Sequence, residues 1–433
     1  MYYLGIDFGT SGARSAVIDE TDQLCWQQSI PFPSPMASGP AQRWRTTLFQ
    51  LIQAIPPRYK AAIARIAING TSATVLLCDE TGTPLTEPLM YSDRCPPDSL
   101  APLANIAPAG HLVLSPSSSL AKLLSWRSHP LFPQARFLLH QADWIAAQLH
   151  GRWGISDYHN CLKLGYDPAQ RAYPNWFDHD FIAPLRSLLP QALTPGTVVG
   201  PPQATLARHL GLPSQTEICA GTTDSIAAFL ASPAQGPGEA VTSLGSTLVI
   251  KLLSQTRIDQ FESGIYSHWF GSAWLVGGAS NTGGAVLAHF FTPTELTTLS
   301  LQIDPQQNLD LNYYPLLKPG ERFPIQDPDL EPRLPSPEAD PVTVLQGLLQ
   351  SMARIEAEGY GKLQALGANP LLRVYTAGGG AQNAAWTVLR QQALGVPVLA
   401  APQTEAAYGT ARLARGYFSQ QASSFPESLS KMD

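Results

Sequence analysis

The sequence predicts an α/β fold built from two domains. The chain has 433 residues, more than one ordinary core holds, and this length favours two or three domains. Strand-like and helix-like patterns occur together in both halves, which is typical of α/β architecture. A stretch rich in proline and glycine, residues 232–238, separates the halves. We therefore expect domains over residues 1–232 and 233–433.

The first half begins with two short apolar runs around a turn of small residues. Apolar stretches bounded by turn residues predict strands, and apolar residues at helical spacing predict helices. The expected strands are residues 2–6, 15–18, 63–68, 73–78 and 217–220, and the expected helices are residues 44–55, 120–126, 142–149 and 225–230. Residues 79–82 read as a tight turn of a hairpin.

The second half repeats this mixture after the proline and glycine stretch. The expected strands are residues 240–243, 247–253, 273–276, 371–376 and 396–400, and the expected helices are residues 342–366, 385–394 and 405–417. Residues 378–380 are three glycines between a strand and a helix, which predicts a tight turn at that point.

Composition and charge exclude several classes of protein. Hydrophobic residues make up 44% of the chain and charged residues 14%, which suits a globular protein and not a disordered one. The net charge of −6 comes without a dense basic block, so we expect no nucleic-acid partner. Five scattered cysteines without a C-x-x-C pair indicate neither a disulfide framework nor a zinc site. Without a signal peptide or a run of 18 apolar residues, we expect a cytoplasmic protein that does not enter a membrane.

The first candidate site is the segment from Asp7 to Gly12. A turn of small residues lets successive backbone N–H groups surround an anion such as phosphate, and Thr10 and Ser11 add hydroxyl donors. A carboxylate at the end of a strand, here Asp7, can hold a magnesium ion directly or through water. The alternative is a plain hairpin with a solvated Asp7.

Two further turns offer related chemistry in the second half. Gly245, Ser246 and Thr247 form a small-residue turn that could bind phosphate from the other side. Gly379 and Gly380 permit the close approach of a flat ligand. Asn383 could contact a base or cap the following helix, and Trp386 could pack on the same ligand or in the core; both alternatives stay open.

Three more polar residues follow predicted strands. Asp224 can cap the next helix, which is the more common role, or act as a general base for a hydroxyl that attacks a phosphoryl group. Ser72 and Asp93 could bind hydroxyl groups or simply form turns. No P-loop, nucleophile elbow or H-E-x-x-H motif occurs. The histidines show no ligand spacing, and we expect His150 and His159 to be exposed in a polar stretch.

Taken in order along the chain, these segments resemble the FGGY family of carbohydrate kinases. Residues 3–14 resemble the first phosphate motif of the family, residues 221–224 its catalytic-base segment and residues 244–247 its second phosphate motif. Residues 378–383 with Trp386 resemble its adenosine motif, and residues 405–411 match its last helix. A stretch of its C-terminal domain is similar to residues 313–324. The resemblance therefore covers almost the whole chain.

The resemblance implies two ribonuclease-H-like domains, of the type found in actin and hexokinase, that flank a cleft. It implies ATP and Mg²⁺ as cofactors and a small sugar as substrate. Asp224 would be the catalytic base, Asp7 would assist magnesium through water, and Ser11 would face the sugar. Thr10 and the second phosphate motif would meet the ATP phosphates. The residues around adenine would be Gly379, Gly380, Asn383 and Trp386.

Substrate choice depends on the segment after residue 68. Xylulose kinases carry a Ser-Gly-Gln-Met-His type segment there and glycerol kinases a Gln-Arg-Glu type segment, whereas this chain has residues 69–74 as Asn-Gly-Thr-Ser-Ala-Thr. The pattern looks most like the cyanobacterial and plant kinases that act on D-ribulose, with Ser72 and Asp93 as sugar contacts. D-Xylulose or another polyol, an actin-like ATPase and a non-catalytic nucleotide-binding regulator remain the alternatives. The sequence leaves the oligomeric state open.

Overall fold

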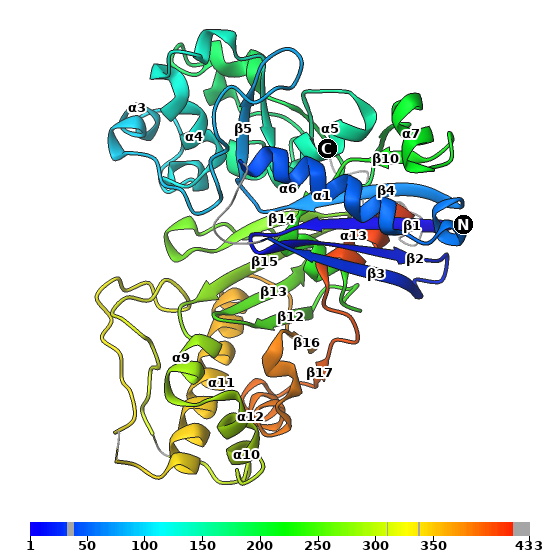
Figure 1. Cartoon of the computed structure of the whole chain (residues 1–433). Coiled ribbons are helices and arrows are strands. Elements are labelled where there is room, and N and C mark those ends of the chain that lie inside the picture. The colour runs from blue at the N-terminus through cyan, green and yellow to red at the C-terminus, as the bar shows by residue number, and fades with distance from the viewer. Residues whose placement is uncertain (33–38, 310, 337, 419–433) are drawn as a thin grey trace, which may run out of the picture. The chain divides into compact units, whose positions relative to one another are not determined.

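The chain folds into two compact units, shown in the computed structural model of Figure 1. The structure describes residues 1–32, 39–309, 311–336 and 338–418. Unit 1 comprises Met1–Ala231 together with residues 405–418, and unit 2 is Ser232–Thr404. The chain thus changes unit within the proline and glycine stretch and returns near residue 405. The expected second domain, residues 233–433, extends beyond unit 2, because unit 2 ends at Thr404 and the chain then returns to unit 1.

Unit 1 is built on a mixed sheet in the strand order β3-β2-β1-β4-β10-β9. A seventh strand, β11, also pairs with β4 and lies outside this order. β1 and β2 form an antiparallel hairpin, whereas β4 runs parallel to β1, β10 and β11. The strands are β1 Tyr2–Phe8, β2 Gly12–Ile18, β3 Leu24–Pro31, β4 Ile63–Gly70, β9 Val198–Gly200, β10 Glu217–Cys219 and β11 Thr222–Thr223. Two small sheets pair β5 Val75–Cys78 with β6 Phe137–His140 and β7 Ile155–Asp157 with β8 Gln191–Leu193.

The helices of unit 1 cover this sheet and enclose two cores. They are α1 Pro40–Ala54, α2 Pro57–Lys60, α3 Ala101–Ala104, α4 Ser119–Ser125, α5 Gln141–His150, α6 Tyr158–Cys161, α7 Ala204–Leu210, α8 Asp224–Leu230 and α13 Ala406–Arg415. One core lies between the main sheet, α1 and α5, and a second one involves α4 and the β5–β6 pair. α1 follows its predicted pattern, since Trp44, Leu48 and Leu51 all face the first core.

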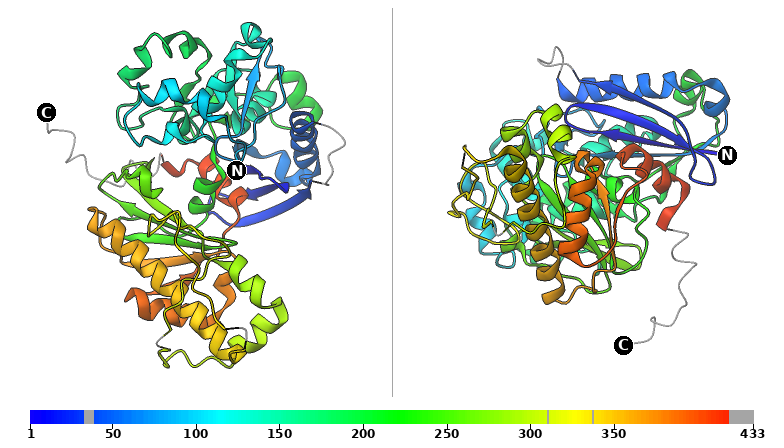
Figure 2. Two further views of the ribbon diagram at one scale, coloured as in Figure 1. Left: turned by 90° about the vertical axis from the view of Figure 1, so that its left-hand side faces the viewer. Right: turned by 90° about the horizontal axis from the view of Figure 1, so that it is seen from below.

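The return of the chain to unit 1 depends on two glycines. α13 packs on β1 and α8, and in Figure 2 it lies beside the first strands in both views. A Cβ at Gly5 would overlap the backbone of Ala407 and Ala411, and one at Gly409 would overlap the carbonyl oxygen of Ala227. Only glycine allows this approach of backbone to backbone. α13 is therefore part of the first domain's core, which explains the discontinuous division of the chain.

Unit 2 contains a six-stranded sheet in the order β14-β15-β13-β12-β16-β17. β12 runs parallel to β16 and antiparallel to β13. Helix α11, which carries the longest predicted apolar pattern, contributes Leu345, Leu348 and Met352 to the core. The elements are β12 Glu239–Leu244, β13 Leu248–Ser254, β14 Tyr266–Phe270, β15 Ala273–Ser280, β16 Arg373–Ala377, β17 Val398–Ala400, α9 Gly284–Phe290, α10 Pro293–Ser300, α11 Pro341–Ala365 and α12 Ala384–Leu394.

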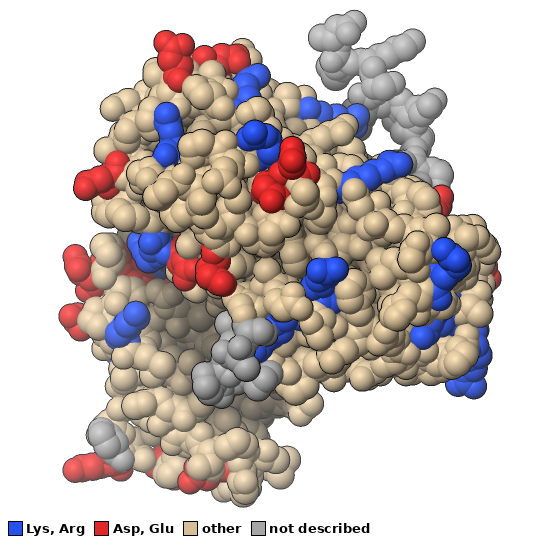
Figure 3. All heavy atoms as spheres, turned by 45° about the horizontal axis from the view of Figure 1, so that its top comes forward, with Lys and Arg blue, Asp and Glu red and all other residues tan. Residues whose placement is uncertain are grey.

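Seven of the described strands escape the sequence patterns: β3, β6, β7, β8, β9, β11 and β14. β3 alternates half-buried and exposed residues at the edge of its sheet, and β14 is short and carries His268 in its centre. Charged residues on the face in Figure 3 are scattered, with basic and acidic side chains interspersed. Within the described ranges, no helix combines the length and the apolar character needed to cross a membrane.

Candidate active site

Three parallel strand ends meet at one edge of the unit 1 sheet. In register, Asp7 of β1 lies beside Asn69 of β4, and Asn69 in turn lies beside Thr222 of β11. Asp224 follows β11 as the first residue of α8. The carboxyl ends of parallel strands share one edge, which is where α/β sheets bind ligands. The structure therefore brings the two predicted catalytic carboxylates, Asp7 and Asp224, to the same edge.

Asp7 is the more deeply buried of the two carboxylates. The residue is 4% exposed, and within the described residues its Oδ1 has no hydrogen-bond partner. Its Oδ2 lies 3.5 Å from Nη1 of Arg14. Burial and, to a smaller extent, the negative charge of Asp224 raise the pKa of Asp7 to about 7, against the opposing effect of Arg14. Asp7 thus offers a buried oxygen that a cation would satisfy.

A magnesium ion at this edge would need ligands beyond the protein. No group of three or more His, Cys, Asp or Glu in the described residues is arranged to hold a metal ion. Magnesium commonly binds through one or two carboxylates, water and substrate phosphates. The unpartnered Oδ1 of Asp7 fits that mode.

Asp224 is half-buried at the start of α8. The helix cap position belongs to Thr223, and the carboxylate of Asp224 accepts a hydrogen bond of 2.7 Å from the backbone N–H of Ser225. This bond is local and orients the carboxylate. Asp224 is therefore not the cap of α8, which removes the more common of its two predicted roles.

The predicted phosphate turn of unit 1 is a tight hairpin next to Asp7. The N–H of Gly9 donates to the carbonyl of Gly12 at 3.0 Å, and Thr10 and Ser11 are exposed at the tip. Their hydroxyl groups are accessible to a ligand beside the strand end that carries Asp7.

The predicted sugar contacts lie on two loops of unit 1 that are joined by hydrogen bonds. Ser72 is half-buried in the turn after β4, whereas Asp93 is exposed. Asp93 Oδ2 accepts from the N–H of Met90 at 2.7 Å, and the N–H of Tyr91 donates to Oγ1 of Thr74 at 2.9 Å. The structure therefore brings the loops of Ser72 and Asp93 together. Asp93 also performs the turn-forming role that was its alternative.

In unit 2 the two glycine-containing turns lie side by side. β12 and β16 are parallel neighbours, with Ser243 beside Ala377, so the turns that follow them share one edge. Gly378 has φ of +85°, and a Cβ there would come within 2.6 Å of the carbonyl oxygen of Leu244. A Cβ at Gly379 would meet nothing within 4 Å. Gly379 thus lines open space beside residues 245–247.

The structure adds Gly283 and Gly284 to this edge. The N–H of Gly284 donates to the carbonyl of Gly245 at 2.8 Å, and that of Ala285 donates to Ser246 at 3.1 Å. A Cβ at Gly283 would come within 2.8 Å of the Ser246 carbonyl oxygen. The segment of Gly283 and Gly284 therefore packs against the turn of residues 245–247 and is hydrogen-bonded to it. The glycine pair that two residues separate from the end of β15 was the signal that could have found them.

The two residues predicted around adenine have structural roles in unit 2. Asn383 caps α12 by accepting from the N–H of Trp386 at 2.9 Å, and its amide donates to Ser300 at 2.8 Å. Trp386 is 2% exposed in the core, and a Cβ at Gly380 would lie 2.7 Å from its ring. Trp386 therefore packs against the glycine turn, and its ring is too buried to stack on a ligand.

His159 is buried, contrary to expectation. It is 2% exposed, and its Nδ1 lies 2.8 Å from Oγ1 of Thr222, next to the strand end that carries Asp224. Burial lowers the pKa of His150 to about 4, so it is not freely solvated either. The sequence pattern around both residues is polar because Asp157 and Asn160 are buried there and hydrogen-bonded to each other.

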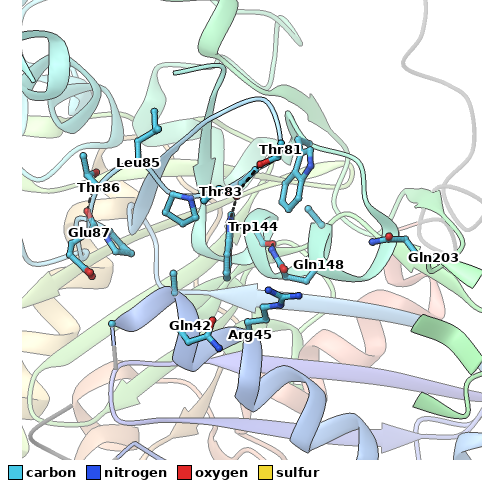
Figure 4. Close-up of a pocket in the computed structure, with 17 residues that line it drawn as sticks. Gln42, Arg45, Thr81, Thr83, Leu85, Thr86, Glu87, Trp144, Gln148 and Gln203 are labelled. Carbon is cyan, nitrogen blue, oxygen red and sulfur yellow. Dashed lines mark hydrogen bonds between the residues drawn. The ribbon is translucent and has the colours of Figure 1, made fainter. Parts of the chain in front are cut away.

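A cavity of about 760 Å³ in unit 1 is separate from this edge (Figure 4). It lies between α1, the turn after β5 and α5, with Arg45, Thr81 and Gln148 among its lining residues. Trp144 in its wall donates its indole N–H to the carbonyl of Gly82 at 2.9 Å. None of the predicted site residues lines this cavity, which opens at the far end of β5 from Ser72.

Comparison with known proteins identifies relatives along the whole chain. The N-terminal domain of the FGGY family of carbohydrate kinases matches residues 2–231, and the C-terminal domain of that family matches residues 240–415. A gluconokinase of Bacillus subtilis is 22% identical over 364 residues, 76% of this chain and 70% of the relative. A xylulose kinase of Escherichia coli is 22% identical over 409 residues, 89% of this chain and 83% of the relative. The structure of a xylulose kinase from Lactobacillus acidophilus superposes with a TM-score of 0.82 at 16% identity, covering 97% of this chain and 90% of the other.

Proposed function

The chain belongs to the FGGY family of carbohydrate kinases, whose members use ATP, and we propose that its acceptor is a pentulose, with D-ribulose first. The product would be D-ribulose 5-phosphate. The observation that carries the proposal is the pair Asp7 and Asp224 at one strand edge, with a phosphate-type turn directly beside Asp7.

In the proposed reaction, Asp224 accepts the proton of the terminal hydroxyl of the sugar. The oxygen then attacks the γ-phosphorus of ATP in line, the bond to the β,γ-bridging oxygen breaks, and ADP leaves. The half-buried position of Asp224 and its bond from Ser225 keep the carboxylate oriented for this transfer. Positioning and preorganised charge supply most of the rate enhancement in such reactions.

The roles of the other residues follow from where they lie. Asp7 would hold Mg²⁺ through its buried Oδ1, directly or through water. When bound, Mg²⁺ supplies charge neutralisation for the phosphate oxygens. Thr10 and the turn of residues 245–247 would bind the phosphates, and Gly379 and Gly380 would form the wall against adenine. Ser11, Ser72 and Asp93 would contact the sugar.

The preference for D-ribulose over D-xylulose and glycerol rests on the loop after β4. Thr71 and Thr74 are buried and bonded to each other, and Ala73 has φ of +65°, so residues 71–74 form a tight turn with small side chains. An imidazole or guanidinium group, as in the xylulose and glycerol kinase segments, is absent from this turn. D-Xylulose and D-gluconate remain candidates because kinases with those names are among the relatives.

The test measures ADP release with ATP and Mg²⁺ across D-ribulose, D-xylulose, L-ribulose, D-gluconate, glycerol and no sugar. We expect the highest kcat/KM for D-ribulose, with the phosphorylated product identified by mass spectrometry. The Asp224→Asn variant should lower kcat by about 10²–10⁴-fold, the usual contribution of a general base. Asp79→Asn is the matched control, because Asp79 bonds only within its own surface turn.

Two outcomes would contradict the proposal. A folded Asp224→Asn variant with nearly normal kcat would remove the base assignment. Equal ADP release with and without sugar would favour the ATPase alternative instead of a kinase acting on a pentulose.

A further inference from the structure

A lysine that the proposed reaction does not use is fully buried beside the two loops of the sugar site. Lys122 lies in the middle of α4 and is 0% exposed. Its Nζ donates to the carbonyl oxygen of Ala73 at 2.8 Å and to that of Met90 at 2.6 Å. A buried ammonium group carries a large desolvation cost unless it is hydrogen-bonded. The burial of Lys122 is therefore coupled to the positions of these two carbonyl groups.

Both acceptors belong to the loops that carry the proposed sugar contacts. Ala73 directly follows Ser72, and its left-handed φ of +65° is a conformation that alanine rarely adopts. Such strain persists only where the surroundings impose it. The bond from Lys122 to the Ala73 carbonyl provides one such constraint.

The second acceptor organises the turn of Asp93. The Met90 carbonyl also accepts from the N–H of Asp93 at 2.9 Å, while the Met90 N–H donates to the Asp93 carboxylate. Tyr91 completes the junction through its bond to Thr74. Without Lys122, the two loops would remain joined by the Tyr91–Thr74 hydrogen bond and by the short β-bridge between Val75 and Leu89.

The charge of Lys122 also bears on Asp93. Burial lowers the pKa of Lys122 to about 8, whereas the negative charge of Asp93 opposes that shift. The two groups therefore interact, although Asp93 is exposed and Lys122 is not. This interaction favours the orientation of the Asp93 turn that faces Lys122.

We propose that Lys122 is a positioning residue that holds the loops of Ser72 and Asp93 in the arrangement required for sugar binding. This inference rests on the proposed function, since it assigns sugar contacts to these loops. It predicts a selective effect: loss of the ammonium group reduces the population of the binding-competent loop arrangement and raises the KM for the sugar in proportion.

The test replaces Lys122 by methionine, which keeps most of the aliphatic stem and removes the donors. We expect the KM for the preferred sugar to rise about tenfold or more, with the KM for ATP changed less than twofold. Hydrogen exchange of the amides of Thr74, Tyr91 and Asp93 should become faster than in the wild type. The Leu124→Ala variant is the control, since it removes a buried apolar side chain from the same helix, and that side chain has no donor for either carbonyl.

An unchanged sugar KM in a folded Lys122→Met variant would overturn the inference, because Lys122 would then be only a core residue. A comparable rise of sugar KM in Leu124→Ala would overturn it too, because any loss of stability would then suffice. If Lys122→Met does not fold, Thr74→Val tests the same junction by removing the acceptor of the Tyr91 N–H. Its sugar KM should rise while its ATP KM stays constant, and no change in either would refute the junction.

Failure of the proposed function is recognised separately. If the wild type phosphorylates no sugar in the panel, the pentulose proposal fails, and the exchange measurement alone then decides the role of Lys122. Equal exchange of the three amides in the wild type and in Lys122→Met would show that Lys122 does not hold the loops.

Discussion

Asp7 combines a proposed magnesium-binding position with an unfavourable charge. Its ionised form is buried, has an unpartnered oxygen and experiences the negative charge of Asp224. Functional carboxylates are often held in environments that shift their pKa in this way. The free-energy cost of burying the ionised carboxylate of Asp7 should therefore make the unfolding free energy of the protein depend on pH.

The protonation of Asp7 should make the stability of the folded protein depend on pH. The pKa of Asp7 rises from 3.8 to about 7 on folding, so the folded protein binds the extra proton between these values. The stability that protonated Asp7 contributes is fully present below about pH 4 and is lost as the pH rises through about 7. The Asp7→Asn variant does not titrate, so it should be more stable than the wild type at pH 8, by up to about 4 kcal/mol.

Thermal unfolding at pH 5 and pH 8 measures this difference. The gap between Asp7→Asn and the wild type should shrink towards pH 5, and Mg²⁺ with ATP should raise the Tm of the wild type more than that of the variant. A gap of the same size at both pH values would mean that Asp7 does not titrate as the structure indicates.

At the scale of elements, unit 2 holds its two turns through a buried ion pair. Arg390 of α12 makes two hydrogen bonds, of 2.6 and 2.8 Å, to Glu356 of α11. Glu356 also accepts from Thr242 of β12, and Arg390 donates to Thr376 of β16. Thr242 lies two residues before the end of β12, and Thr376 lies two residues before the turn that begins at Gly378. The pair thus connects both helices to the strands that position residues 245–247 and 378–380.

We predict that breaking one side of this pair is costlier than removing both sides. Glu356→Gln leaves the arginine charge buried without an anionic partner and should reduce the free energy of unfolding by about 3–5 kcal/mol. The double variant Glu356→Leu with Arg390→Met should lose less than the sum of its two single variants. Urea unfolding of the wild type, Glu356→Gln, the two single variants and the double variant tests this, and strictly additive losses in the double variant would contradict it.

At the scale of the whole molecule, unit 1 is assembled from two segments of the chain that are separated by unit 2. The segment after residue 404 completes the core of unit 1, where Asp22 in the turn after β2 forms ion pairs with Arg412 and Arg415 at 3.1 and 2.7 Å. β1, which carries Asp7, therefore has a helix from the opposite end of the sequence as its packing partner. The site edge of unit 1 depends on both ends of the chain.

This dependence predicts a contrast between two Gly→Ala substitutions. Gly5→Ala places a methyl group against the backbone of α13 and should destabilise the protein by about 1–3 kcal/mol. Gly361→Ala, in the interior of α11 with open space around it, should stabilise by about 0.5–1 kcal/mol. The two Tm values should shift in opposite directions. An unchanged Tm for Gly5→Ala would show that α13 does not pack on β1 as closely as described.

Most of the local features were predictable from the sequence. The apolar period of residues 44–55 marked α1, and the apolar runs around residues 9–11 marked the hairpin that carries Asp7. β3 and β14 were missed because an edge strand with half-exposed residues lacks a clear period, and β6, β7, β8, β9 and β11 were missed because two to four residues carry too little pattern. Asn383 and Trp386 looked the same as ligand contacts or as structural residues, because only burial separates the two roles.

The sequence by itself determined the α/β class, the turns of small residues and the two carboxylates, because these depend on period, residue type and order along the chain. It also carried the motifs that resemble the kinase family. Only the tertiary structure decided that residues 405–418 return to unit 1, that His159 is buried against Thr222 and that Lys122 joins two loops. Each of these depends on contacts between residues far apart in the chain, whose burial and partners no local pattern records.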